Sequence, residues 1–326
     1  MNGYQDKVSQ QIEQYAAGYD EFPIPEMFHY WSHTYVRERV VRIFGTETTT
    51  DFYANQFSEL FLSCERPNIV SFGSGDAAQE IQIAQALLAM GRSNFRFLCL
   101  DLIPESVARA NRSAVAAGVS EVLSSRVFDV NLDDLPIQID GAMAHQSLHH
   151  FVELERTFDL IARQMPDHGM FLTQDMIGRN GHMRWPEVLN FVESIWRDLP
   201  DQKKYNHITK RIYPNFINFD CSKEGFEGIR AQDILPLLVE RFDFSGFVGE
   251  GGVIEVFLDR SFGHNFRSNN EVDRQFVDAL ELFNSALLSA GKIKPTMMIA
   301  RMGKIGKCPP TKSCNGITPT RSIRSC

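Results

Sequence analysis

The sequence lacks any long hydrophobic run. No stretch of about eighteen consecutive apolar residues occurs among its 326 residues, so no membrane-spanning helix is predicted. Residues 1–6 also lack the basic start and apolar centre of a signal peptide. We therefore expect a cytoplasmic protein without a membrane partner.

An excess of positive charge is missing too. Lys and Arg together number 33 against 41 Asp and Glu, which gives a net charge of -8 at pH 7. Nucleic-acid backbones are bound by basic surfaces. The composition therefore argues against nucleic acid as the main partner.

Cysteine is scarce, and its spacing fits no standard zinc pattern. The six cysteines are scattered along the chain. Cys99 lies inside an apolar run, where a free cysteine usually serves as a small core residue. We expect reduced thiols. What the chain does have is 43% hydrophobic residues, enough at this length for a sizeable core.

A glycine-containing turn is the most informative stretch. Residues 69–72 form a short apolar run, Gly73 and Gly75 follow, and residues 77–88 carry apolar side chains at helical spacing. Glycines there let the backbone take positive φ and let a ligand approach the main chain, while a helix start presents free N–H groups. This strand, turn and helix predict a nucleotide or cofactor cradle.

A second strand ends in an acidic residue. Residues 95–100 are apolar, Asp101 follows them, and residues 104–111 open another helix. A carboxylate at this place can accept hydrogen bonds from both hydroxyls of a ribose. Two elements therefore point to one adenosine-type ligand.

Further strands complete the series. Residues 127–130, 139–144 and 169–175 indicate strands three to five, and we expect further strands at 242–248, 252–258 and 295–302. The series from 67 to 177 resembles the class I S-adenosylmethionine-dependent methyltransferases. The resemblance implies an α/β, Rossmann-like fold with a mostly parallel seven-stranded sheet flanked by helices. It leaves a homodimer open.

The resemblance also implies the cofactor S-adenosylmethionine and residues that bind it. The glycine turn would meet its methionine end, Asp101 its ribose, the segment after strand three its adenine, and the loop after strand four its sulfonium side. The cofactor-binding candidates are Ser71, Gly73, Ser74, Gly75, Asp101, Leu102, Asp129, Val130, His145 and Gln146. The chain departs from the family pattern at Ser71, where an acid is usual, and at Ala77, where a third glycine is usual.

Histidines dominate the loop after strand four. His149 or His150 is the predicted general base, because an imidazole can remove a proton from an acceptor near neutral pH. Packing at a helix start is the alternative. No metal is predicted, although His145 and His149 could share a helical face, because no HExxH arrangement is present.

The remaining segments are assigned around this domain, which we place at 67–302. Residues 1–66 are expected to form an N-terminal helical cap, with Tyr30 and Trp31 on the substrate side; simple core packing is the alternative. Residues 185–230 are expected to form a substrate-side insertion, and 303–326 a flexible tail. The other acceptor-side candidates are Asp175, His182 and Arg184.

These features predict a methyltransferase that acts on a hydroxyl or amine of a small molecule, including one of specialised metabolism. Two alternatives stay open. Ser71 at the usual acid position is compatible with a methyltransferase-like binding protein that does not catalyse. The glycine turn also satisfies the looser Gly-x-Gly-x-x-Ala pattern of NAD(P)-dependent oxidoreductases.

Overall fold

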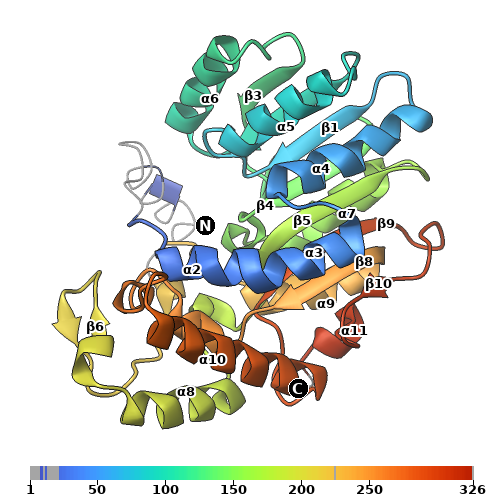
Figure 1. Cartoon of the computed structure of the whole chain (residues 1–326). Coiled ribbons are helices and arrows are strands. Elements are labelled where there is room, and N and C mark those ends of the chain that lie inside the picture. Colours follow the sequence, from blue (N-terminus) through green and yellow to red (C-terminus); the bar gives the residue numbers. More distant parts are fainter. Residues whose placement is uncertain (1–7, 10–11, 13–21, 224, 325–326) are drawn as a thin grey trace.

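A twisted sheet forms the centre of the computed structural model, which describes residues 8, 9, 12, 22–223 and 225–324 (Figure 1). Within these residues the sheet has eight strands in the order β10-β8-β9-β5-β4-β1-β2-β3. The strands are β1 (Asn68–Phe72), β2 (Arg96–Asp101), β3 (Leu123–Val127), β4 (Gly141–His145), β5 (Met170–Met176), β8 (Phe242–Glu250), β9 (Met297–Lys304) and β10 (Lys312–Ser313).

Strands β3, β2, β1, β4 and β5 are parallel, and β9 and β8 pair antiparallel beside them. This confirms the predicted α/β, Rossmann-like fold, with the two-residue β10 as an additional edge strand. Because parallel strands share a direction, their carboxyl ends meet at one edge of the sheet. Phe72, Asp101, His145 and Met176 therefore close their strands along the same edge.

Helices cover both faces of the sheet because strand side chains alternate between two cores. In β1, Ile69 belongs to one apolar cluster, and Val70 and Phe72 belong to the other. The first cluster includes residues of α4, α5 and α6, and the second includes residues of α7 and α9. The α-helices are α2 (Glu26–Trp31), α3 (Arg37–Phe44), α4 (Thr49–Ser58), α5 (Ala78–Ala89), α6 (Pro104–Ala116), α7 (Leu154–Gln164), α8 (Pro186–Asp198), α9 (Ala231–Arg241), α10 (Glu271–Ser289) and α11 (Pro319–Ser322).

The N-terminal helices α2 and α3 are joined by a π-helical turn, η1 (Ser32–Val36), and run alongside α10 (Figure 1). Polar contacts fix this arrangement. The Trp31 indole donates to Glu281 at 2.8 Å, and Arg39 pairs with the same carboxylate. The predicted N-terminal helical region is thus present over 22–66, with its polar anchors on α10, whereas most of 1–21 lies outside the described residues.

The segment between β5 and α9 carries the material that we expected as an insertion. It contains α8 and a two-stranded hairpin, β6 (Tyr205–Asn206) and β7 (Arg211–Ile212), which lie beside α10 in Figure 1. Aromatic contacts hold α8 in place: Phe191 packs edge-on against Phe283, and the buried Trp196 packs against Phe262. No helix among the described residues is long and apolar enough to cross a membrane.

Residues 252–258 do not form the predicted strand. They form a short 3-10 helix, η7 (Ile254–Phe257), after Gly251 and Gly252, whose φ angles are 84° and 109°. The N–H of Gly252 donates to Thr296 Oγ1, and the N–H of Val253 donates to Asn284 Oδ1. Side chains therefore take the hydrogen bonds that a strand would make, and the chain turns away from the sheet.

The predicted flexible tail, 303–326, is wrong for its described part, 303–324. Strand β9 continues to Lys304, and β10 pairs in parallel with Gly246 and Phe247 of β8. Thr311 Oγ1 donates to Phe244 O at 2.7 Å, and Cys314 is buried. The physical reason is that the outer edge of β8 offers unpaired backbone groups, which this segment covers. The five described cysteines, Cys64, Cys99, Cys221, Cys308 and Cys314, are free thiols.

Candidate active site

The glycine turn has the geometry that its sequence predicts. Gly73 and Gly75 have φ angles of 73° and 54°. A Cβ on Gly73 would lie 2.7 Å from the Cβ of Ser147, so no larger residue fits where β1 meets the loop after β4. Ala77, in place of the usual third glycine, still adopts a left-handed φ of 55° at the start of α5.

The turn offers donors and space for a ligand. A Cβ on Gly75 would meet nothing within 4 Å, so the main chain there is approachable. The buried Ser74 Oγ has no hydrogen-bond partner. Helix α5 begins at this turn without a side-chain cap, which leaves its first N–H groups for a ligand or water. The residues present therefore fit a polar cofactor.

Asp101 joins the second strand to the turn. Its Oδ2 accepts the N–H of Gly75 at 2.7 Å, and its Oδ1 accepts the N–H of Ile103 at 2.9 Å. Burial raises the pKa of Asp101, and these two backbone bonds partly oppose the rise. The structure thus brings Asp101, and Leu102 beside it, to the predicted cradle.

Glu80 is a residue of this cradle that sequence reasoning missed. Ser71 Oγ donates to Glu80 Oε1 at 2.6 Å, and both side chains are buried. Burial raises the pKa of Glu80 to about 7. A carboxyl group from α5 therefore lies beside position 71, where the sequence lacks the usual acid. The available signal was an acidic residue within an otherwise apolar helix face, next to Ile81 and Ile83.

The segment after β3 forms a local turn. Asp129 Oδ1 accepts the N–H of Asn131 at 2.9 Å, and the N–H of Asp129 donates to Asp133 at 2.8 Å. Val130 is buried in the second core cluster. These contacts place both predicted adenine-side residues at the carboxyl edge of the sheet but show no direct link to the turn.

The end of β4 lies beside the glycine turn. Ser147 Oγ donates to Phe72 O at 2.7 Å, which ties the loop to the last residue of β1. Gln146 has a φ of 52°, uncommon for this residue type. His145 Nδ1 lies 3.4 Å from the hydroxyl of Tyr53 on α4, a second residue that the sequence analysis missed. Burial lowers the pKa of His145.

Asp175, at the end of β5, fixes the loop after β4. Its Oδ2 accepts the N–H groups of Ser147 and Leu148, both at 2.8 Å, and its Oδ1 contacts His149 Nδ1 at 2.6 Å. Burial raises the pKa of Asp175, but attraction to His149 and these hydrogen bonds outweigh burial and lower it overall. An anionic Asp175 therefore orients His149 so that Nδ1 donates to the carboxylate and Nε2 faces Glu227.

Three histidines and one glutamate meet at this point, and we call them the histidine–glutamate cluster: His149, His150, His182 and Glu227. Nε2 of His149 and Nε2 of His150 each lie 3.6 Å from a carboxylate oxygen of Glu227. Nε2 of His182 lies 2.7 Å from Glu227 Oε1. The sequence had marked the histidines but not Glu227, which follows 45 residues after His182 in the chain.

The electrostatics of the cluster differ from one histidine to the next. Burial lowers the pKa of His149, but the attraction of Asp175 and Glu227 raises it overall. Burial and the neighbouring His149 lower the pKa of His150 to about 4. Burial raises the pKa of Glu227, yet the surrounding histidines bring it down to about 2. The cluster thus places an anionic carboxylate between one imidazole whose pKa is raised, His149, and one whose pKa is lowered, His150.

Three predicted acceptor-side residues lie outside the cluster. Arg184 donates to Glu255 at 2.7 Å, Tyr30 donates to Asp278 at 2.9 Å, and Trp31 donates to Glu281. These donor groups are occupied by contacts within the protein, whereas Arg184 Nε is buried without a hydrogen-bond partner among the described residues. Asp175 and His182 are the acceptor-side candidates that the structure brings together with His149 and His150.

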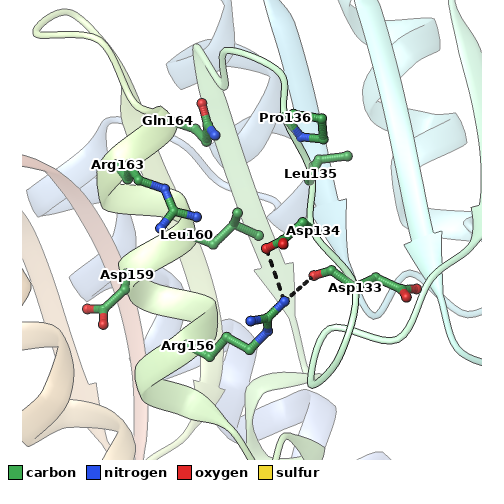
Figure 2. A pocket seen from close by; sticks show the side chains of 9 residues that line it. All are labelled: Asp133, Asp134, Leu135, Pro136, Arg156, Asp159, Leu160, Arg163 and Gln164. Carbon is green, nitrogen blue, oxygen red and sulfur yellow. Dashed lines mark hydrogen bonds and ion pairs between the residues drawn. The ribbon is translucent and has the colours of Figure 1, made fainter.

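A hollow of about 580 Å³ lies apart from these residues, between residues 133–136 and α7 (Figure 2). Arg156 reaches toward residues 132–134 and donates to Leu132 O, Asp133 O and Asp134 Oδ1. No predicted site residue lines this hollow. Arg156 already donates hydrogen bonds to residues 132–134. We therefore assign this hollow no role in the chemistry.

Comparison with known proteins supports the interpretation of the glycine turn as part of a methyltransferase domain. Residues 71–173, from Ser71 of β1 to Thr173 of β5, match the model of the family described as methyltransferase domain. Together with the fold, this match defines the class: residues 71–173 belong to a methyltransferase domain, built on a sheet of the class I, Rossmann-like type. No curated protein sequence matches the chain significantly.

Solved structures with a similar arrangement are distant in sequence. One is the O-methyltransferase from a trans-AT PKS multienzyme of Brevibacillus brevis in complex with S-adenosyl-L-homocysteine, at 11% identity, covering 79% of this chain and 80% of that chain, with a TM-score of 0.44. Another is the geranyl diphosphate C-methyltransferase of Streptomyces coelicolor, at 12% identity, covering 77% of this chain and 76% of that chain, with a TM-score of 0.40.

Proposed function

We propose that this enzyme methylates a hydroxyl or amine of a small molecule. The observation that carries the proposal is the loop after β4, which touches both halves of the site. Ser147 Oγ bonds to Phe72 O at the glycine turn, while the N–H of Ser147 bonds to Asp175 beside the histidine–glutamate cluster. A methyl donor on the turn and an acceptor at the cluster would therefore be neighbours.

The residues around the turn are proposed to hold the cofactor. S-adenosylmethionine supplies an electrophilic methyl group on a sulfonium sulfur. Asp101 would accept hydrogen bonds from the ribose hydroxyls, and Glu80 with Ser71 would receive the methionine ammonium group. The proposal for Glu80 rests on its buried carboxyl, which has Ser71 as its hydrogen-bond donor and no cation beside it in the described part of the chain. The remaining candidates are Gly73, Ser74, Gly75, Leu102, Asp129, Val130, His145 and Gln146.

The acceptor side is proposed to lie at the histidine–glutamate cluster. Positioning two reactants in line can contribute about 7–11 kcal/mol to a reaction barrier, so the main task of this chain is alignment. A hydroxyl or ammonium acceptor must also lose a proton. The predicted bases His149 and His150 are both in the cluster, and Asp175 holds His149 in a fixed orientation.

Mass spectrometry tests this function. The full chain would be incubated with small-molecule extracts and S-adenosylmethionine carrying a labelled methyl group, and products heavier by that group would be identified. Asp101→Asn should reduce labelling and weaken cofactor binding by about 1–3 kcal/mol, because ribose hydroxyls lose a charged acceptor. Asp198→Asn, on the exposed side of α8, is the matched control and should behave as the parent chain. Equal labelling with and without enzyme would contradict the proposal.

A further inference from the structure

The histidine–glutamate cluster has the composition of a metal site. Among the residues that the structure describes, His149, His182 and Glu227 form a group whose ligand atoms all lie within 4.8 Å of one another. Two imidazoles and one carboxylate form a common ligand set for divalent transition metals in proteins. We propose that these three side chains bind a divalent transition-metal ion, with His150 beside them as a further ligand.

The spacing of the ligand atoms fits one ion. Two atoms that each lie about 2.1 Å from a tetrahedral metal are about 3.4 Å apart. Nε2 of His149 and Nε2 of His150 are each 3.6 Å from an oxygen of Glu227, which is longer than a hydrogen bond. The 2.7 Å contact between His182 and Glu227 would have to lengthen by about 0.7 Å to reach this spacing.

The supporting residues resemble those of built metal sites. A metal-binding histidine usually donates its second ring nitrogen to a carboxylate, which fixes the ring and its tautomer. His149 makes this contact with the fully buried Asp175 at 2.6 Å. Because Asp175 also accepts the N–H groups of Ser147 and Leu148, it is itself fixed in place. The free side of His149 is therefore aimed at Glu227 before any ligand arrives.

The other two ligands are carried by loops that are locked together. His182 has a φ of 55°, a conformation that costs energy for a non-glycine residue and persists where the surroundings enforce it. Beside it, the N–H of Gly181 donates to Gly228 O at 2.8 Å, and a Cβ on Gly228 would lie 3.1 Å from both Gly181 N and His182 Cε1. Glycine next to Glu227 thus allows the close approach that brings the carboxylate to His182.

A backbone hydrogen bond also joins the loop that carries Glu227 to the turn that carries His149. The N–H of Ile229 donates to the carbonyl of His149 at 3.1 Å, so the loop that carries Glu227 is bonded to the helical turn η3 (Leu148–His150). The side chain of Glu227 is 40% exposed and that of His182 is 17% exposed, so the cluster opens to solvent on that side. An ion could enter there, and water or an acceptor could occupy its remaining positions.

The donor set selects the kind of ion. Calcium and magnesium prefer oxygen ligands, whereas imidazole nitrogen suits zinc, iron, cobalt and nickel. Two histidines and a carboxylate with open positions occur in catalytic zinc sites and in non-haem iron(II) sites. Zinc and iron(II) are therefore the expected ions.

A metal here would deepen the proposed function, on which this consequence rests. An ion can bind the oxygen or nitrogen of an acceptor and make its proton easier to remove. The O–H or N–H bond would then break with its proton passing to water, while the bond to the methyl carbon forms and the carbon–sulfur bond breaks. The ion would take the place of the histidine base that the sequence predicts.

Metal binding to the full, tag-free chain provides the test, without cofactor or acceptor. The protein would be stripped with a chelator and titrated with Co²⁺, which reports its ligands by visible absorption, and with Zn²⁺ in competition. His182→Asn and Glu227→Gln each remove one ligand, and Asn tolerates the left-handed backbone at position 182. His33→Ala, an exposed histidine on η1, is the matched control.

The expected result is one bound ion per chain in the parent and the control, and affinity lowered by more than about 100-fold in both ligand variants. Asp175→Asn, if it folds by its melting curve, should lower affinity by about 10–100-fold. No binding by the parent chain, or equal binding by the parent and both ligand variants, would overturn the proposal and leave Glu227 as a counter-ion of His182. Calorimetry with S-adenosylmethionine on the same samples tests the proposed function separately.

Discussion

Ser71 Oγ donates a 2.6 Å hydrogen bond to Glu80 Oε1, and both side chains are buried. The first strand of the sheet and the helix after the glycine turn are thus joined by a serine and an acid, where the family usually has an acid on the strand alone. We expect Glu80 to supply the carboxyl group that position 71 lacks.

The pH dependence of stability should report this buried acid. Burial raises the pKa of Glu80 from 4.5 to about 7, so the folded state binds more protons than the unfolded state between these values. The contribution of Glu80 to stability should therefore fall by about 3 kcal/mol as the pH rises from about 4.5 to about 7. Urea unfolding at pH 4.5 and pH 8 measures the difference.

Glu80→Gln is the matching variant, because its amide oxygen can still accept from Ser71 but does not ionise. It should equal the parent chain near pH 4.5 and be more stable than the parent at pH 8. The exposed Glu193→Gln on α8 serves as the control. Parallel stability curves for the parent and Glu80→Gln would show that Glu80 is not a neutral buried acid.

The packed C-terminal segment makes a second prediction. A chain that ends at Lys307 would lose β10 and α11, uncover the edge of β8 and expose Cys314. We expect a loss of about 2–4 kcal/mol in the free energy of unfolding, comparable to the exposure of one or two core side chains. Ile305→Ala, at a largely exposed position, should leave the melting temperature unchanged. If the truncated chain were as stable as the parent, the C-terminal segment would not contribute to stability, and the predicted flexible tail would be supported.

Trp31 allows a test of the N-terminal helices. Trp31→Phe removes the donor to Glu281 and should lower the stability of the fold by about 1–3 kcal/mol, because a buried carboxylate loses one of its hydrogen bonds. Cofactor affinity should not change if these helices serve packing on α10. His29→Ala, an exposed neighbour on α2, is the control for general effects on the helix. Weaker cofactor binding in Trp31→Phe at unchanged stability would instead support the predicted cap.

The sheet and the cradle could be predicted because their signals are local. The glycines at 73 and 75 and the acid at 101 follow apolar runs directly, and adjacent positions in a parallel sheet bring them together. The histidines of the loop after β4 could be placed at the same edge for the same reason. Residues 252–258 were misassigned because their apolar composition is compatible with a strand, whereas the two glycines before them turn the chain.

Residues whose role depends on distant packing could not be found. Glu227 follows 45 residues after His182, and nothing in its own neighbourhood marks it as the partner of three histidines. Glu281 becomes the anchor of Trp31 and Arg39 only when α10 lies beside the N-terminal helices. The tail was misjudged because its composition predicts disorder, while its order comes from the open edge of β8.

Calorimetric titration with S-adenosylmethionine is the most direct test of the central claim that the glycine turn holds the cofactor. Gly73→Ala would place a Cβ 2.7 Å from Ser147 at a φ of 73°, whereas Gly118→Ala meets open space at nearly the same φ of 72°. The two variants share the backbone strain, and only Gly73→Ala adds a close contact, which lies at the turn. The account predicts tight binding by the parent and Gly118→Ala and at least about tenfold weaker binding by Gly73→Ala. Equal affinity of the two variants, or no binding by the parent chain, would contradict it.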